Sequence, residues 1–214
     1  MSEPCYSDEF VTLYHGRCED VLPTLSGVDL VCTDPPYGMD YKPLRGGDGS
    51  KRWSAGVQGD DCPFDPAHLM QYERLVLWGA NWYADRLPPS GGWIVWDKTP
   101  RGHKVGFHAS HAELAWTNIT SSVRKFSLQW GGEARGGEPH LHPTQKPVAL
   151  MRWTMEQFAS PGWVVLDPYM GSGPLAQACS EMGLRYIGVE IDERYCEIAA
   201  KRLAQGVLDF GAVS

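Results

Sequence analysis

The last quarter of the chain is an unbroken succession of strand, turn, helix, strand and helix. An apolar run at 163–166 leads into a glycine-containing turn at 167–173, and Pro174 to Met182 has the composition of a helix. A second strand follows from Arg185 to Glu190, and a second helix from Glu193 to Leu203. Two strands joined by a helix form a βαβ unit, in which the strands run parallel. This succession predicts an α/β chain with a mostly parallel sheet and helices on both faces.

The turn of this unit has the features of a nucleoside-binding loop. Gly171 and Gly173 let the backbone approach a ligand closely at the start of a helix, and Glu190 ends the next strand, 19 residues after Gly171. An acidic side chain at that place can accept hydrogen bonds from ribose hydroxyls. The pattern favours a nucleoside-containing cofactor over the alternative, a purely structural turn.

A second informative stretch is Asp34-Pro35-Pro36-Tyr37, directly after the strand-like run from Val28 to Thr33. Its carboxylate and the Pro35 carbonyl, held in place by Pro36, can accept the two N–H bonds of an exocyclic amine and draw the nitrogen lone pair out of conjugation. Tyr37 offers a ring on which a base can stack. The stretch therefore predicts amine chemistry, with an ordinary exit from a sheet as the alternative.

The remaining elements are shorter and separated by loops. Residues 38–60 hold six glycines and four basic residues, which predicts a mobile lid beside the site or a solvated linker. Lys51, Arg52 and Trp53 in this loop are candidate nucleic-acid contacts. Strands are expected at 10–14, 75–79, 92–96, 113–117 and 122–129, and helical segments at 18–25, 66–74, 81–87 and 147–159.

Composition limits the class of protein. With 214 residues we expect a single domain, 1–214. No apolar run reaches membrane-spanning length and the first ten residues do not resemble a signal peptide, so we expect a soluble, cytoplasmic protein without a membrane partner. The net charge is −7, yet residues 99–146 carry six basic against three acidic side chains. The part of this segment at 99–141 is a candidate substrate-recognition insertion, in which Arg101, Lys104, Arg124 and Lys125 could contact a phosphate backbone.

Neither cysteine nor histidine spacing indicates a metal. The six cysteines are scattered without a C-x-x-C pair, which predicts reduced thiols and no disulfide framework. His103, His108 and His111 lack a carboxylate or cysteine at a matching spacing, so we expect no metal site.

Three motifs in order resemble one family. Residues 34–38 (DPPYG), 142–147 (HPTQKP) and 167–173 (DPYMGSG) resemble motifs of the amino-methyltransferases of DNA, which methylate adenine N6 or cytosine N4 with S-adenosylmethionine. The catalytic motif precedes the cofactor loop, which is similar to the circularly permuted beta arrangement of the family. The resemblance implies a Rossmann-like S-adenosylmethionine-dependent methyltransferase fold, DNA as substrate, and a bacterial or phage-encoded enzyme of the restriction-modification type that forms homodimers in some members.

The resemblance also implies residue roles. Asp34, Pro35, Pro36 and Tyr37 would hold the target amine and its base. Residues of the second and third motifs, with Glu190, would bind the cofactor: Thr144, Gln145, Lys146, Asp167, Pro168, Tyr169, Gly171, Ser172 and Gly173. An aspartate at the head of the catalytic motif favours adenine, since the cytosine enzymes more often have serine there; cytosine N4 methylation, a non-catalytic binding subunit, and RNA or small-molecule methylation are the alternatives.

Two positions depart from the family pattern. Pro174 stands where threonine usually follows Gly-Ser-Gly, and Gly16-Arg17 stands where Gly-Asp is common. Proline is tolerated at the first helical position, so we expect Pro174 to tune cofactor affinity. Any cofactor contact at position 17 is in doubt.

Overall fold

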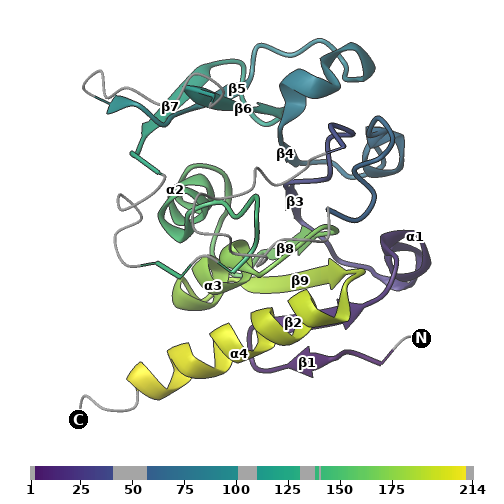
Figure 1. The fold of residues 1–214 in the computed structure, drawn as a ribbon, viewed down its shortest axis with the longest axis vertical. Helices are drawn as coiled ribbons and strands as arrows, with labels where there is room; N and C mark the ends of the chain where they lie inside the picture. Colours follow the sequence, from purple (N-terminus) through teal and green to yellow (C-terminus); the bar gives the residue numbers. More distant parts are fainter. Residues whose placement is uncertain (1–2, 41–56, 101–109, 131–137, 140, 211–214) are drawn as a thin grey trace, which may run out of the picture.

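One mixed sheet organises the chain. The computed structural model describes residues 3–40, 57–100, 110–130, 138–139 and 141–210. Within these ranges nine strands lie in the order β1-β2-β9-β8-β3-β4-β6-β5-β7, from one end of the molecule to the other (Figure 1). The strands are β1 (Tyr6–Ser7), β2 (Val11–His15), β3 (Leu30–Thr33), β4 (Leu75–Trp78), β5 (Trp93–Asp97), β6 (Ala112–Thr117), β7 (Val123–Ser127), β8 (Val164–Asp167) and β9 (Arg185–Glu190).

Most neighbouring strands are parallel. The strands β2, β9, β8, β3 and β4 pair in parallel, as do β5 and β7. The strand β6 is antiparallel to both of its neighbours, and β1 is antiparallel to β2. The expected α/β fold with a mostly parallel sheet is therefore confirmed.

Apolar side chains cover both faces of the sheet, as alternate residues of buried strands point to opposite sides. On one face the helices α2 (Val148–Phe158), α3 (Pro174–Glu181) and α4 (Glu193–Phe210) pack over a core that includes Trp78 and Trp96. On the other face lie α1 (Cys18–Val21) and three short 3₁₀ turns, at Pro66–Leu69, Ala80–Trp82 and Ala84–Arg86. A further short 3₁₀ turn, Leu22–Thr24, follows α1 directly.

Two expected helices are wrong in type. The segment 66–74 forms only the turn at Pro66–Leu69, which the Asp65 side chain caps by accepting the Ala67 N–H at 3.0 Å. The segment 81–87 is divided at Tyr83, whose hydroxyl donates to the Trp78 carbonyl at 2.6 Å and whose ring is buried. The pull of Tyr83 into the core interrupts helical geometry there, with φ −136°.

The candidate insertion at 99–141 contributes two strands to the sheet. The strand β6 lies between β4 and β5, and β7 forms the outer edge. Its described residues are thus mostly framework. Residues 101–109, 131–137 and 140, like most of the expected lid at 38–60, lie outside the described ranges.

The expectation that all cysteines are reduced is wrong for one pair. Cys5, which precedes β1, and Cys196 of α4 form a disulfide. The spacing of 191 residues hid this pairing, because only the folded sheet brings the amino-terminal hairpin beneath α4. Cys18, Cys32 and Cys179 are free and buried, and Cys62 is free and exposed.

No helix within the described ranges is long and apolar enough to cross a membrane.

Candidate functional site

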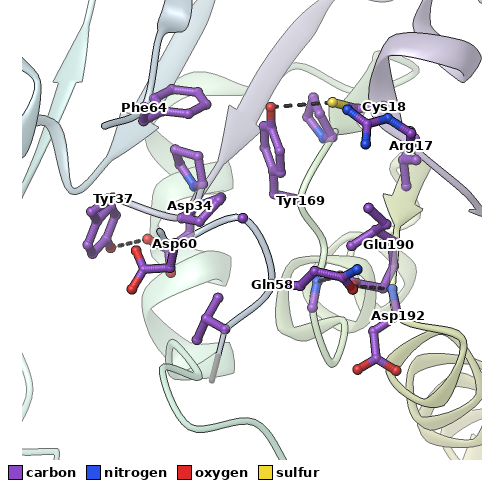
Figure 2. A pocket seen from close by; sticks show the side chains of 18 of the residues that line it. Arg17, Cys18, Asp34, Tyr37, Gln58, Asp60, Phe64, Tyr169, Glu190 and Asp192 are labelled. Atoms are coloured by element: carbon purple, nitrogen blue, oxygen red, sulfur yellow. Dashed lines mark hydrogen bonds between the residues drawn. The ribbon is translucent and has the colours of Figure 1, made fainter. Parts of the chain in front are cut away.

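A cavity of about 670 Å³ opens at the edge of the sheet where the parallel strands end. Asp34 follows β3, Pro168 follows β8 and Glu190 ends β9. Figure 2 shows Asp34 and Tyr37 on one side of this cavity, and Glu190 and Asp192 on the other. The fold therefore brings two widely separated sequence motifs to one site, as expected for the carboxyl edge of an α/β sheet.

The stretch 34–37, for which the sequence predicts amine binding, forms one wall. Asp34, Pro35, Pro36 and Tyr37 all line the cavity. The Tyr37 hydroxyl donates to Asp34 Oδ1 (Figure 2). Its ring lies against Gly79, where an added Cβ would stand 1.8 Å from Cε1 of the ring. Gly79, at φ +69°, is thus required for the position of Tyr37.

The chain that leaves this wall is fixed by Asp60, which sequence reasoning did not single out. The buried Asp60 accepts hydrogen bonds from the backbone N–H groups of Gly38, at 2.7 Å, and Met39, at 3.1 Å, both on Oδ1. Gly38 also packs on the backbone of Cys62, 2.4 Å from where a Cβ would stand. Because Asp60 lies in a glycine-rich loop, no pattern in the sequence marked it as a residue that holds the site in place.

Behind the wall lies an ion network of alternating charge. The Lys146 ammonium binds Asp34 Oδ2 at 2.6 Å, Glu113 Oε2 at 2.9 Å and the Tyr37 hydroxyl at 3.0 Å. Lys98 binds the other oxygen of Glu113. Lys146 is only 4% exposed, so its charge is balanced almost wholly by these carboxylates.

Burial and charge oppose each other in this network. Burial raises the pKa of Asp34, Lys146 acts to lower it, and Glu113 adds to the rise. For Glu113, burial acts to raise the pKa, but Lys146 and Lys98 outweigh it and lower the value to about 2. Burial likewise acts to lower the pKa of Lys146, and Asp34 and Glu113 more than compensate, so that pKa is raised.

The first residue of the glycine turn is structural in its contacts. Asp167 is 5% exposed and accepts hydrogen bonds from the Thr33 hydroxyl at 2.6 Å, the Tyr169 N–H at 3.1 Å and the Tyr186 hydroxyl at 3.3 Å. Burial raises its pKa to about 7. Asp167 thus joins β3, β8 and β9 beneath the loop and does not line the cavity.

The second acid does line the cavity, on the far side from Asp34. Glu190 Oε2 accepts the Gly171 N–H at 2.9 Å, and its Oε1 accepts the Asp192 N–H at 2.8 Å. Burial raises the pKa of Glu190. Each carboxylate oxygen keeps a further lone pair for a ligand hydroxyl.

The other expected cofactor residues divide into two groups. Thr144, Pro168, Tyr169 and Gly171 line the large cavity. A hollow of about 50 Å³ beside it is lined by four more: Gln145, Lys146, Asp167 and Ser172.

Two of the expected cofactor residues, Gln145 and Gly173, also make contacts that support the fold. Gln145 is buried and accepts the Leu141 N–H at 2.9 Å, while its amide donates to Glu138 at 2.7 Å. Gly173 caps α3 at φ +74°, and a Cβ there would stand 2.9 Å from the Ala199 Cβ of α4. Gly173 therefore serves the close approach of two helices.

An aromatic group on the cavity wall was not predicted. Phe64 meets Tyr169 edge to face at 5.6 Å, and the Tyr169 hydroxyl lies 3.1 Å from His68 Nε2. The same hydroxyl accepts a hydrogen bond from the Cys18 thiol at 3.3 Å (Figure 2). Phe64 and His68 come from the segment that the sequence placed in or beside a helix. Arg17, the departure from the family pattern, lines the same cavity with an exposed side chain.

The expected DNA contacts are only partly described. Lys51, Arg52, Trp53, Arg101 and Lys104 lie outside the described residues. Arg124 and Lys125 are exposed on the edge strand β7, where Lys125 pairs with Asp97 at 2.9 Å. Among the described side chains, no group of three His, Cys, Asp or Glu could hold a metal ion.

Comparison with known proteins points to one family. A family model for N6 and N4 methyltransferases, described as DNA methylase, matches residues 85–201. Type II methyltransferase M.HinfI of Haemophilus influenzae is 38% identical, over 96% of this chain and 71% of its own length.

Solved structures share the fold. The PvuII DNA methyltransferase, which is cytosine-N4-specific, superposes with a TM-score of 0.63 at 15% identity, over 94% of this chain and 89% of the other. The complex of M1.HpyAVI with SAM gives a TM-score of 0.51 at 21% identity, over 90% of this chain and 99% of the other. With a family match over more than half of its length and a curated relative over nearly all of it, the chain belongs to the DNA N6/N4 amino-methyltransferase family.

Proposed function

We propose that this protein transfers a methyl group from S-adenosylmethionine to the exocyclic N6 amine of adenine in DNA. The observation that carries the proposal is the wall formed by residues 34–37, where the Asp34 carboxylate faces a cavity that Glu190 closes on the other side. The aspartate at the head of the motif favours adenine over cytosine within the family.

The cavity suits the cofactor. Its volume of about 670 Å³ falls within the range of small-molecule sites. Glu190 offers carboxylate oxygens for the ribose hydroxyls, and the aromatic group of Phe64, His68 and Tyr169 offers apolar and polar surface for a purine. When bound, S-adenosylmethionine supplies an electrophilic methyl group on a sulfonium, so that a C–S bond breaks as the N–C bond forms.

The protein makes the amine reactive through hydrogen bonding. The Asp34 carboxylate and the carbonyl of Pro35 accept hydrogen bonds from the two N–H groups of the amine. These hydrogen bonds draw the nitrogen toward tetrahedral geometry and free its lone pair. After methyl transfer the amine nitrogen is positively charged and therefore acidic, and Asp34 or water takes its proton. Positioning contributes much of the rate, since well-oriented reactants gain about 7–11 kcal/mol over a bimolecular encounter.

The base must leave the duplex to reach this wall. Flipping costs a few kcal/mol. Tyr37 contributes a stacking face, for which base–aromatic contacts are worth roughly 1–3 kcal/mol. The remaining DNA contacts, from Lys51, Arg52, Trp53, Arg101, Lys104, Arg124 and Lys125, stay predictions, as does a homodimer.

The test is direct. The protein is incubated with labelled S-adenosylmethionine and unmethylated DNA, and the modified nucleoside is identified by mass spectrometry. We expect N6-methyladenine. Recovery of N4-methylcytosine alone would overturn the adenine assignment, and absence of label from DNA would point to a binding subunit or to an RNA or small-molecule substrate.

The variants Asp34→Ala and Asp34→Asn separate binding from chemistry. Asp34 and Gly171 lie on loops that follow different strands, so the cofactor side of the cavity should stay folded. We expect single-turnover methyl transfer to fall by about 10²–10³-fold, with measurable calorimetric binding of S-adenosylhomocysteine retained. A folded variant that methylates DNA at the wild-type rate would show that Asp34 is not the amine acceptor.

A further inference from the structure

The ion network contains one acid, Glu113, to which neither the sequence motifs nor the chemistry above gives a role. It is the second residue of β6 and lies opposite Trp96 of β5. Because β6 is antiparallel to β4 and β5, its first residues lie at the same edge as the last residues of the parallel strands. Glu113 therefore reaches the back of the catalytic wall from a strand that no family motif marks.

Glu113 competes with Asp34 for one ammonium. Lys146 lies 2.9 Å from Glu113 Oε2 and 2.6 Å from Asp34 Oδ2, so its single positive charge is shared by two carboxylates. The other oxygen of Glu113 is held by Lys98, which also lies 4.7 Å from the centre of the Trp96 ring. The second cation anchors Glu113 in place.

The sharing matters for the amine. A carboxylate that alone balances a buried ammonium is a weaker hydrogen-bond acceptor for a third group, because its electron density is already drawn to the cation. If Lys146 were paired with Asp34 only, the ammonium and the substrate amine would compete for the same carboxylate. Glu113 removes part of that competition.

We propose that Glu113 is a positioning residue that acts through Lys146: by drawing the ammonium between two carboxylates, it keeps Asp34 available as the acceptor of the substrate amine. This inference rests on the proposed function, since it concerns the same Asp34. Glu113 itself does not line the cavity, so it is not placed to contact substrate or cofactor directly.

Glu113→Gln keeps the shape and removes the charge. We expect the single-turnover rate of DNA methylation to fall by about 10- to 100-fold, the range expected for loss of one hydrogen bond to a charged group, with cofactor affinity little changed. Glu113→Asp, which keeps the charge on a shorter side chain, should recover part of the loss. Glu197→Gln, which breaks an exposed pair with Lys201 on α4, is the matched control and should behave as wild type.

The double-mutant cycle with Lys146→Met tests whether Glu113 acts through Lys146. We expect the double variant to be no slower than Lys146→Met alone, because the ammonium that Glu113 positions is then absent. If the rate loss of the double variant equalled the product of the losses of the two single variants, Glu113 would act by a route independent of Lys146, and the proposal would be overturned. A folded Glu113→Gln variant with the wild-type rate would overturn it as well.

A second readout does not depend on activity. Carbon NMR of labelled Asp34 follows its titration in the free protein, where the neighbouring titratable groups are Lys146, Glu113, Tyr37, Tyr83, Asp167 and Cys32. Glu113→Gln should move the Asp34 titration to lower pH, because a repelling charge is lost while Lys146 remains. If the Asp34 titration did not move, or moved to higher pH, the coupling between Glu113 and Asp34 would be refuted, whatever substrate the wild-type protein modifies. If the titration moved to lower pH but the wild-type protein did not methylate DNA, only the proposed function would be refuted. If Glu113→Gln does not fold, the same comparison is made with Glu113→Asp, in which the coupling requires a smaller shift in the same direction.

Discussion

Gly79→Ala should impair the wall formed by residues 34–37, which we propose to be catalytic, while leaving the Glu190 side of the cavity intact. Gly79 follows β4 with φ +69°, and an added Cβ would stand 1.8 Å from Cε1 of Tyr37. Carbon atoms pack at about 3.5 Å or more, so the ring must retreat by about 1.7 Å. Since a misplacement of about 1 Å can cost 10²-fold in rate, we expect single-turnover methylation of DNA to fall by at least about 10²-fold.

A second alanine substitution, at a glycine with a similar backbone conformation but open space around it, separates the stability cost of the backbone from the effect of the steric clash. Gly27 has nearly the same conformation, φ +71°, but nothing lies within 4 Å of where its Cβ would stand. Both alanine variants should lose about 1–2 kcal/mol of unfolding free energy from the left-handed backbone. For a chain of this length each kcal/mol lowers Tm by roughly 2–4 °C.

The assay compares the two variants at one temperature, well below both Tm values. Calorimetry should find wild-type affinity for S-adenosylhomocysteine in both, because Glu190 lies across the cavity from Tyr37 and its carboxylate accepts the Gly171 N–H. Gly27→Ala should methylate DNA at the wild-type rate. If Gly79→Ala also methylated DNA at the wild-type rate, the packing of the Tyr37 ring against Gly79 would be irrelevant to catalysis, which would refute the reasoning.

Three further substitutions probe single contacts. Tyr37→Phe keeps the ring but removes the hydroxyl that donates to Asp34, and it should lower the single-turnover rate by about 10-fold or more, given about 1.5–3 kcal/mol for a hydrogen bond to a charged group. Glu190→Gln should weaken calorimetric binding of S-adenosylhomocysteine by about 10-fold with little effect on the folded state's circular dichroism, and unchanged affinity would remove Glu190 from the cofactor site. Asp167 has a pKa of about 7 when folded against 3.8 ordinarily, so it contributes stability at low pH that is lost as pH rises from about 4 to about 7. Asp167→Asn should flatten the urea-unfolding free energy across that range, and an unchanged slope would contradict the raised pKa.

Local pattern predicted much of the fold. The strands that end at Thr33, Trp78, Asp167 and Glu190 were all expected within about two residues, because buried parallel strands are continuous apolar runs bounded by turn residues. The motifs at their carboxyl ends followed from the same reasoning. The association of Asp34 with Glu190 at one cavity could be inferred because parallel strands present their ends at a common edge.

Long-range contacts overrode local pattern elsewhere. Tyr83 has ordinary helical neighbours, yet its hydroxyl bonds to the Trp78 carbonyl and the segment breaks into two turns. Asp60 lies in a glycine-rich loop with no period, and its role depends on backbone groups more than 20 residues earlier. The Cys5–Cys196 disulfide spans 191 residues. In each case the partner is set by tertiary packing, which a window of neighbouring residues does not contain.

Glu113 illustrates a limit that follows from strand direction. Searching for functional side chains just after strands finds Asp34 and Glu190, since both belong to parallel strands that point toward the cavity edge. An antiparallel strand brings its beginning to that edge, so in β6 the residue to examine is the second and not the last. A charged side chain near the start of a strand that is otherwise apolar, as in Ala112–Thr117, is therefore as informative in a mixed sheet as an acid at a strand end. Such a residue can be recognised from sequence only once the direction of its strand is known. For β6 that direction depends on its pairing with β4, in which even the closest register pair, Trp78 with Ala115, is 37 residues apart, and so on the folded sheet.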